Sequence, residues 1–276
     1  MLVGIHQSFT GLDCLVSDAK SIDANTFQFF IRNNRNCSAR VFQPWEFEYF
    51  NTSLLRSNIS SYVLHASYAM NPATYKSELR ERTKSIILSD MLLLSKMAGI
   101  KKYVLHPGAY TDGSPVQAMD NLISLLHEVS NKQLGVQICL ETMGGQGTQI
   151  MSDLQSIKYV LEGISDLDNV GLCIDTCHYF VAGIINTDLI KFIETLPKDY
   201  IGVVHLNGTN NSFGSRVDRH ASLFNSKLPV NIVSELISVV HSLNNETCFI
   251  LETPSDCLLQ DFFDLKIKCK TELGII

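Results

Sequence analysis

Short runs of apolar residues recur along the whole chain, and longer segments with room for a helix separate them. Within these runs the apolar residues follow one another directly instead of alternating with polar ones. Continuous apolar strands are typical of a parallel sheet that is covered on both faces. The pattern predicts eight buried strands, at residues 2–6, 26–31, 61–65, 102–106, 136–141, 170–175, 201–205 and 248–252.

The segments between these strands carry apolar residues at helical spacing. They predict helices at 75–98, 116–129, 153–162, 188–196 and 230–243, and we expect the first to end at Gly99 as its C-cap. Strand and helix therefore alternate, which indicates an α/β fold: a single (β/α)8 TIM barrel that spans residues 1–276 as one domain. A doubly wound open sheet is the alternative.

Composition narrows the class of protein. The 276 residues carry 28 acidic and 22 basic side chains, and a net charge of −6 by itself disfavours a nucleic-acid partner. No apolar run approaches the roughly 18 residues of a membrane span, and the start of the chain lacks the pattern of a signal peptide. The eight cysteines include no CxxC pair, so we read them as free thiols of a protein in the reducing cytoplasm.

Histidines and carboxylates, the side chains most able to bind metal, lie at the ends of the predicted strands. His65, His106 and His205 each follow two apolar residues at a strand end. Three other strands end in a carboxylate, at Glu141, Asp175 and Glu252. Because the C-terminal ends of the strands of a barrel converge on one face, we expect these six side chains to meet in one mouth.

Three more donors follow close behind. His178 comes three residues after Asp175, while Asp218 and His220 follow the seventh strand. Five imidazoles and four carboxylates without cations would shift several pKa values far from normal. Mixed nitrogen and oxygen donors suit Zn²⁺, with Mn²⁺ or Fe²⁺ as second choices. Nine donors exceed the needs of one or two ions, and three divalent ions would also offset the charge of −6.

Several motifs, spread from end to end of the chain, resemble those of the endonuclease IV family of DNA-repair enzymes. They are Gly4-Ile5-His6-Gln7-Ser8, His65-Ala66-Ser67-Tyr68, Leu105-His106-Pro107-Gly108, Leu140-Glu141-Thr142-Met143-Gly144-Gly145-Gln146-Gly147-Thr148, Cys173-Ile174-Asp175-Thr176-Cys177-His178, Val204-His205-Leu206-Asn207, Gly214-Ser215-Arg216-Val217-Asp218-Arg219-His220 and Ile250-Leu251-Glu252-Thr253-Pro254. The resemblance implies a TIM barrel with three zinc ions at the C-terminal face of its strands. It also implies hydrolysis of duplex DNA 5′ to an abasic site, leaving a 3′-hydroxyl and a 5′-deoxyribose phosphate.

The same resemblance implies a role for each donor. Glu141 would bridge two ions and position the nucleophilic hydroxide, with Asp175 and Glu252 as further catalytic residues. His6 would not bind an ion itself, but would orient one of the metal-binding residues or a phosphate. The implied sets are His65, His106 and Glu141 for the first ion, Glu141, Asp175, His205 and Glu252 for the second, and His178, Asp218 and His220 for the third.

Recognition of DNA falls to loops at the mouth. The resemblance implies that Arg35 and Tyr68 insert at the lesion, and that Gly145, Gln146 and Arg219 lie beside the DNA strand. The glycine-rich loop lacks the lysine of a P-loop, so we expect no nucleotide cofactor. The chain departs from the family pattern at 208–210, at 221–225 and at 36–37, where an aromatic residue is usual. We expect a monomer without membrane contact.

Two other functions compete with this one. A divalent-metal sugar isomerase or epimerase would use the same barrel and the strand-end donors. Such enzymes need one or two ions, so His178, Asp218 and His220 would be superfluous. A damaged-DNA-binding protein with structural metals is the non-enzymatic alternative.

Overall fold

Eight parallel strands close into a barrel in the computed structural model, which describes residues 1–274. Around the barrel their order is β1-β10-β7-β6-β5-β4-β3-β2, so the first and last barrel strands pair with each other. The closed barrel confirms the predicted fold. The barrel strands are β1 (Leu2–Gln7), β2 (Gln28–Phe30), β3 (Ser61–His65), β4 (Ile100–Leu105), β5 (Val136–Glu141), β6 (Val170–Asp175), β7 (Ile201–Leu206) and β10 (Cys248–Leu251).

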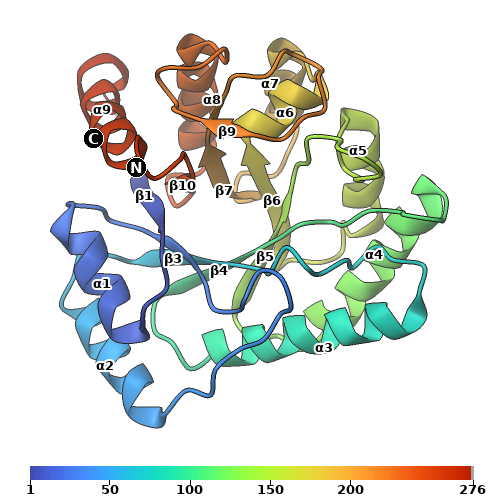
Figure 1. Cartoon of the computed structure of the whole chain (residues 1–276), viewed down its shortest axis with the longest axis horizontal. Helices are drawn as coiled ribbons and strands as arrows, with labels where there is room; N and C mark the ends of the chain where they lie inside the picture. Colours follow the sequence, from blue (N-terminus) through green and yellow to red (C-terminus); the bar gives the residue numbers. More distant parts are fainter. Residues whose placement is uncertain (275–276) are drawn as a thin grey trace.

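The helices form an outer ring around the strands (Figure 1). Their buried faces are mostly leucine, isoleucine, valine and phenylalanine, and these pack on the outward-facing side chains of the barrel. The helices are α1 (Leu12–Ser21), α2 (Pro44–Leu55), α3 (Ser77–Leu94), α4 (Pro115–Ser130), α5 (Leu154–Gly163), α6 (Thr176–Ala182), α7 (Asn186–Glu194), α8 (Val230–Leu243) and α9 (Leu258–Lys268), with a short π-helix η1 (Cys269–Leu273). Within residues 1–274, no helix combines the length and the apolar composition that a membrane crossing requires.

The inside of the barrel holds a separate group of buried side chains, the inner apolar cluster. All of its members are fully buried and small enough to share the barrel interior. Successive side chains of a strand point to opposite faces, so these residues occupy every second position and alternate with those that face the helices. The inner apolar cluster consists of Val63, Val104, Cys139, Cys173, Val203, Cys248 and Ile250.

The predicted end of one helix is wrong. α3 ends at Leu94, with Ser95 at its C-cap, and not at Gly99. Gly99 lies instead in the turn that leads into β4, where its φ of +85° suits glycine. A Cβ at this position would also lie 3.2 Å from the carbonyl oxygen of Ser60. The glycine therefore permits a close approach of two chain segments and does not cap the helix.

A small antiparallel ribbon follows the seventh barrel strand. β8 (Gly208–Thr209) pairs with β9 (His220–Ala221), and the loop between them returns to the mouth of the barrel. The hydroxyl of Thr209 donates a hydrogen bond to the carbonyl oxygen of Arg219 at 2.9 Å. The ribbon thus fixes the backbone on either side of the Asp218-Arg219-His220 motif.

Candidate metal centre

The strand-end donors lie in the barrel mouth because of strand periodicity. In six strands the donor comes two residues after a member of the inner apolar cluster, so it points to the same side of the sheet. These pairs are Val63 and His65, Val104 and His106, Cys139 and Glu141, Cys173 and Asp175, Val203 and His205, and Ile250 and Glu252.

Glu141 lies at the centre of the group and is fully buried. Its Oε2 is 3.1 Å from Nε2 of His106 and 3.3 Å from Nε2 of His65. Its Oε1 is 3.2 Å from Nδ1 of His205. One carboxylate therefore meets imidazoles from three other strands, as a group shared between two cations would.

His205 joins Glu141 to two further carboxylates. Its Nδ1 is 3.3 Å from Oε2 of Glu252 and 3.8 Å from Oδ2 of Asp175. The donor atoms of Asp175, His205 and Glu252 all lie within 4.8 Å of one another, which suits a single ion. The same holds for His65, Glu141 and His205.

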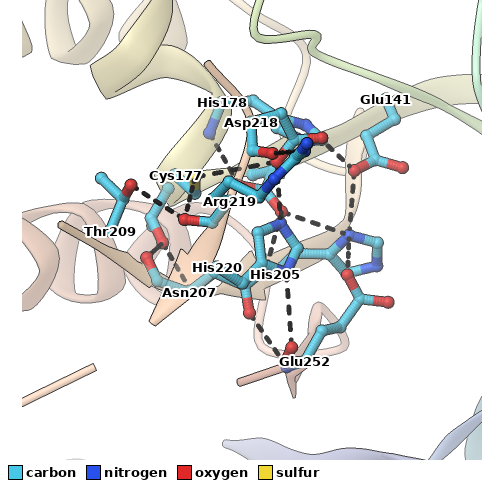
Figure 2. A network of polar contacts seen from close by, with 12 residues as sticks. Glu141, Cys177, His178, His205, Asn207, Thr209, Asp218, Arg219, His220 and Glu252 are labelled. Atoms are coloured by element: carbon cyan, nitrogen blue, oxygen red, sulfur yellow. Dashed lines mark hydrogen bonds and ion pairs between the residues drawn. The ribbon is translucent and has the colours of Figure 1, made fainter. Parts of the chain in front are cut away.

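The third group comes from α6 and from the ribbon (Figure 2). Nε2 of His178 is 3.1 Å from Oδ2 of Asp218, and Nε2 of His220 is 3.4 Å from Oδ1 of the same carboxylate. The Asp175 side chain caps α6 by accepting a hydrogen bond from the backbone N–H of His178 at 2.8 Å. The capping interaction explains why His178, three residues beyond the strand end, returns to the mouth.

The other nitrogen of several rings is already bonded. Nδ1 of His65 donates to the carbonyl oxygen of Ala66, and Nδ1 of His178 donates to that of Thr142, both at 2.8 Å. Because Nδ1 of each ring is held by a carbonyl oxygen, Nε2 is the atom left for a cation, and it faces carboxylates, as in metal-binding histidines. Nε2 of His178 and Nε2 of His220 are buried without a hydrogen-bond partner among residues 1–274. Two such nitrogens aimed at one carboxylate fit a shared cation.

The electrostatics of the site point the same way. Burial raises the pKa of Glu141, but His106 and His205 outweigh it and hold that pKa well below the usual range. Burial lowers the pKa of His205, but Glu252 and Glu141 outweigh it and raise that pKa to about 9. Without metal, protons on the imidazoles balance the carboxylates, and bound cations would take over that balance.

The residues predicted to contact DNA lie at the rim. The Tyr68 ring is half exposed, and its centroid lies 5.2 Å from that of His65 and 5.0 Å from that of His106. Arg35 is exposed in the loop after β2, where it lines a cavity of about 190 Å³ together with Met70 and Arg82. The Tyr68 side chain thus borders the donors of the mouth.

The glycine-rich loop lies against the third donor group. Gln146 is exposed, and its Oε1 accepts a hydrogen bond from the backbone N–H of Asp218 at 3.2 Å. Gly145 has a φ of +77°, a backbone conformation that glycine adopts without strain. Arg219 is exposed, and its guanidinium donates to the carbonyl oxygen of Asp218 at 2.6 Å.

Residues 208–209, part of one departure from the family pattern, are strand β8 of the ribbon. A Cβ at Gly208 would lie only 2.0 Å from the carbonyl oxygen of Ser222, so this pairing requires glycine. The changed sequence therefore supports the segment that carries Asp218 and His220, in addition to any contact with a ligand.

Sequence reasoning missed three neighbours of the donors. The amide of Asn207 donates to Oδ2 of Asp175 at 2.7 Å and accepts from the backbone N–H of Glu252 at 3.0 Å. Sγ of Cys177 lies within 4.8 Å of donor atoms of Asp218 and His220. Gln28, fully buried, contacts three residues of the mouth. A single polar residue between Phe27 and Phe29 was the only sign of it in the sequence.

These features define a TIM-barrel protein with several groups of possible metal ligands in one mouth, and comparison with known proteins agrees with the fold. Residues 16–269 match the family described as the xylose isomerase-like TIM barrel. In structure, the chain superposes on endonuclease IV from Thermus thermophilus with a TM-score of 0.77 and 24% identity, covering 97% of each chain. It also superposes on a D-tagatose 3-epimerase-like protein, with a TM-score of 0.74, 20% identity, and coverage of 100% of this chain and 98% of that one.

Sequence similarity narrows the family further. The chain is 35% identical over 266 residues to a protein of Mycoplasma genitalium named "probable endonuclease 4", covering 93% of this chain and 90% of that one. The chain thus belongs to the endonuclease IV family of nucleases.

Proposed function

We propose that the protein is a zinc-dependent endonuclease that incises duplex DNA 5′ to an abasic site, acting as a single-domain monomer. The observation that carries the proposal is the third donor group, His178, Asp218 and His220, which adjoins the other six donors. A sugar epimerase with one or two ions has no use for it, whereas a three-ion phosphodiesterase does.

The donors fit three zinc ions. His65, His106 and Glu141 would hold the first ion, and Glu141 would bridge to a second held by Asp175, His205 and Glu252. The third would bind His178, Asp218 and His220. When bound, such ions supply an activated water and stabilise negative charge on phosphorus and on the leaving oxygen.

The protein's own residues orient these donors. Hydrogen bonds from ring nitrogens to the carbonyl oxygens of Ala66 and Thr142 fix the rings of His65 and His178. The Asn207 amide holds Asp175 and the backbone of Glu252 together, which fixes the spacing of two carboxylates. A mouth that is set before the substrate arrives does not have to reorganise during the reaction.

Substrate recognition would use the rim. An abasic nucleotide has no base to unstack, so extruding it from the duplex costs less than extruding a normal nucleotide. Tyr68 can stack at the gap, and burial together with the nearby carboxylates raises its pKa, so its phenol stays protonated as a donor. Arg35 can pair with a phosphate. Three divalent cations would offset the net charge of −6, which removes the electrostatic objection to DNA.

The test is incision of a duplex that carries one abasic analogue, with an undamaged duplex of the same sequence as control. We expect cleavage on the 5′ side of the lesion, leaving a 3′-hydroxyl, and no cleavage of the control. An intact damaged strand at stoichiometric, zinc-loaded enzyme contradicts the proposal. Interconversion of ketohexoses by the same preparation would support the epimerase alternative.

A variant distinguishes the proposed endonuclease from a protein that only binds damaged DNA. Glu141→Ala should abolish incision, while a pure damage-binding protein has no turnover to lose. Binding of the damaged duplex by the wild-type protein without any strand cleavage would favour a binding protein.

A further inference from the structure

Gln28 occupies the inner face of β2 at the bottom of the mouth. It pairs with His6 of β1 in the strand register, and its side chain is fully buried. A buried amide must find hydrogen-bond partners, because leaving it unpaired costs the full penalty of removing it from water. Its partners therefore reveal what it does.

All the contacts of the Gln28 amide are with residues of the mouth. Its Nε2 lies 2.5 Å from Oε1 of Glu252 and 2.9 Å from Nδ1 of His6. Its Oε1 lies 2.9 Å from Nε2 of His205. One neutral side chain thus joins a carboxylate and an imidazole that belong to the same candidate ion group.

The direction of each hydrogen bond follows from chemistry. A carboxylate only accepts, so the amide nitrogen of Gln28 must face Glu252, and its carbonyl oxygen must then face His205. A carbonyl oxygen also only accepts, so His205 carries a proton on Nε2 and donates it. The remaining nitrogen, Nδ1, faces Glu141 at 3.2 Å and Glu252 at 3.3 Å.

The contact with Gln28 also gives the two carboxylate oxygens of Glu252 different surroundings. Oε1 accepts a hydrogen bond from Nε2 of Gln28, and Nδ1 of His6 lies 3.0 Å from the same oxygen. Oε2 faces Nδ1 of His205. Oε2 of Glu252 and Nδ1 of His205, the two atoms that remain available, therefore face each other.

We propose that Gln28 is a positioning residue of the metal centre: it selects Nδ1 of His205 and Oε2 of Glu252 as the atoms that bind the second ion. The inference rests on the proposed metal centre and adds a residue outside its nine donors. Its effect passes through His205 and Glu252, so it concerns ion affinity and not direct contact with substrate.

The variant Gln28→Met keeps the length of the side chain and removes the amide. We expect the zinc affinity of one class of sites to fall by about 10–100-fold, as for other residues that orient metal ligands, while the remaining sites keep theirs. The measurement is zinc titration of the metal-free full-length protein against a chromophoric chelator. Gln7→Met is the matched control, because Gln7 is also buried on an inner barrel strand but its amide faces Leu15 and Ala19 of α1.

The outcomes separate the two proposals. If wild-type protein binds no zinc, both the metal centre and the role of Gln28 are wrong. If wild type binds zinc and Gln28→Met binds it as tightly as Gln7→Met, only the role of Gln28 is wrong. A purely structural role would lower the melting temperature of the Gln28→Met protein equally with and without zinc, which also contradicts the inference.

A second measurement needs no variant. In wild-type protein with ¹⁵N-labelled histidine and bound zinc, we expect the His205 ring to carry its proton on Nε2 and to have a metal-shifted Nδ1. A proton on Nδ1 overturns the inference even if Gln28→Met does not fold.

Discussion

Buried charged groups occur in two layers of the barrel interior, and the two layers differ in the partners that these groups have. In the lower layer, the Lys102 ammonium donates to the carbonyl oxygen of Gly202 at 2.9 Å and to that of Glu246, beside the inner apolar cluster. In the mouth, nine titratable donors face one another, and two ring nitrogens lack any hydrogen-bond partner within residues 1–274. A buried ammonium whose hydrogen bonds end on two backbone carbonyls and one buried thiol serves the fold. Titratable groups that converge on one space and leave ring nitrogens without hydrogen bonds indicate a ligand.

The largest expected effect comes from the centre of the mouth. Glu141→Gln keeps the shape of the side chain but removes the charge that four imidazoles contact. Stabilisation by bound cations contributes several kcal/mol to such a reaction, so we expect incision to slow by about 10³-fold or more. Single-turnover cleavage of the abasic duplex measures this. A rate within about tenfold of wild type would mean that the mouth is not the reactive centre.

The next largest effect is on the stability of the metal-free protein as the pH changes. The pKa of His205 is raised from 6.5 to about 9 in the folded state, so the folded state binds the proton more tightly than the unfolded state. The resulting stabilisation is fully present below pH 6.5 and is lost as the pH rises through 9. We expect the free energy of unfolding of chelated protein to fall by up to about 3 kcal/mol over this interval.

Urea denaturation at pH 6.5 and at pH 9 checks this prediction. With zinc bound the trend should reverse, because deprotonated imidazoles bind metal more tightly. If the free energy of unfolding depended on pH equally with and without zinc, the mouth would not differ from the lower layer as a place that binds a ligand.

A smaller effect is expected from the lower layer. Lys102→Met leaves the carbonyl oxygens of Gly202 and Glu246 without their donor, so we expect a loss of about 2 kcal/mol in stability. Zinc affinity and the rate of incision should stay at the wild-type level. Lys101→Met is the control, since Lys101 is a half-buried neighbour on the same strand. A drop in zinc affinity for the Lys102 variant would show that the two layers are coupled.

The fold was predictable where apolar runs were unbroken. The strands at 61–65, 136–141 and 170–175 have the predicted bounds, because a run of buried residues followed by a polar donor marks both ends. The strand expected at 26–31 is confined to Gln28–Phe30, since a strand's extent depends on its pairing with β1 and β3. The helices α1, α6 and α9 and the small ribbon were not predicted, because their patterns are short or irregular.

The site was predictable in part, for reasons that differ from residue to residue. The C-terminal strand ends of a barrel converge on one face, and this placed His65 and Glu141 in the mouth from the sequence alone. Asp218 and His220 were predicted as donors because they follow the seventh strand, but only the resemblance to the family assigned them to a third ion. A ribbon of four paired residues gives no sequence pattern that could have placed them. Gln28 and Asn207 were missed because a neutral amide carries no mark of its partners, which are fixed only when the strands come together.

If the nine donors form one cage, it should hold three cations. The most direct test is the metal content of protein purified without exposure to chelators, measured by elemental analysis against protein concentration. We expect close to three ions per chain, mainly zinc. A value of one ion per chain or fewer would show that the donors do not form such a cage.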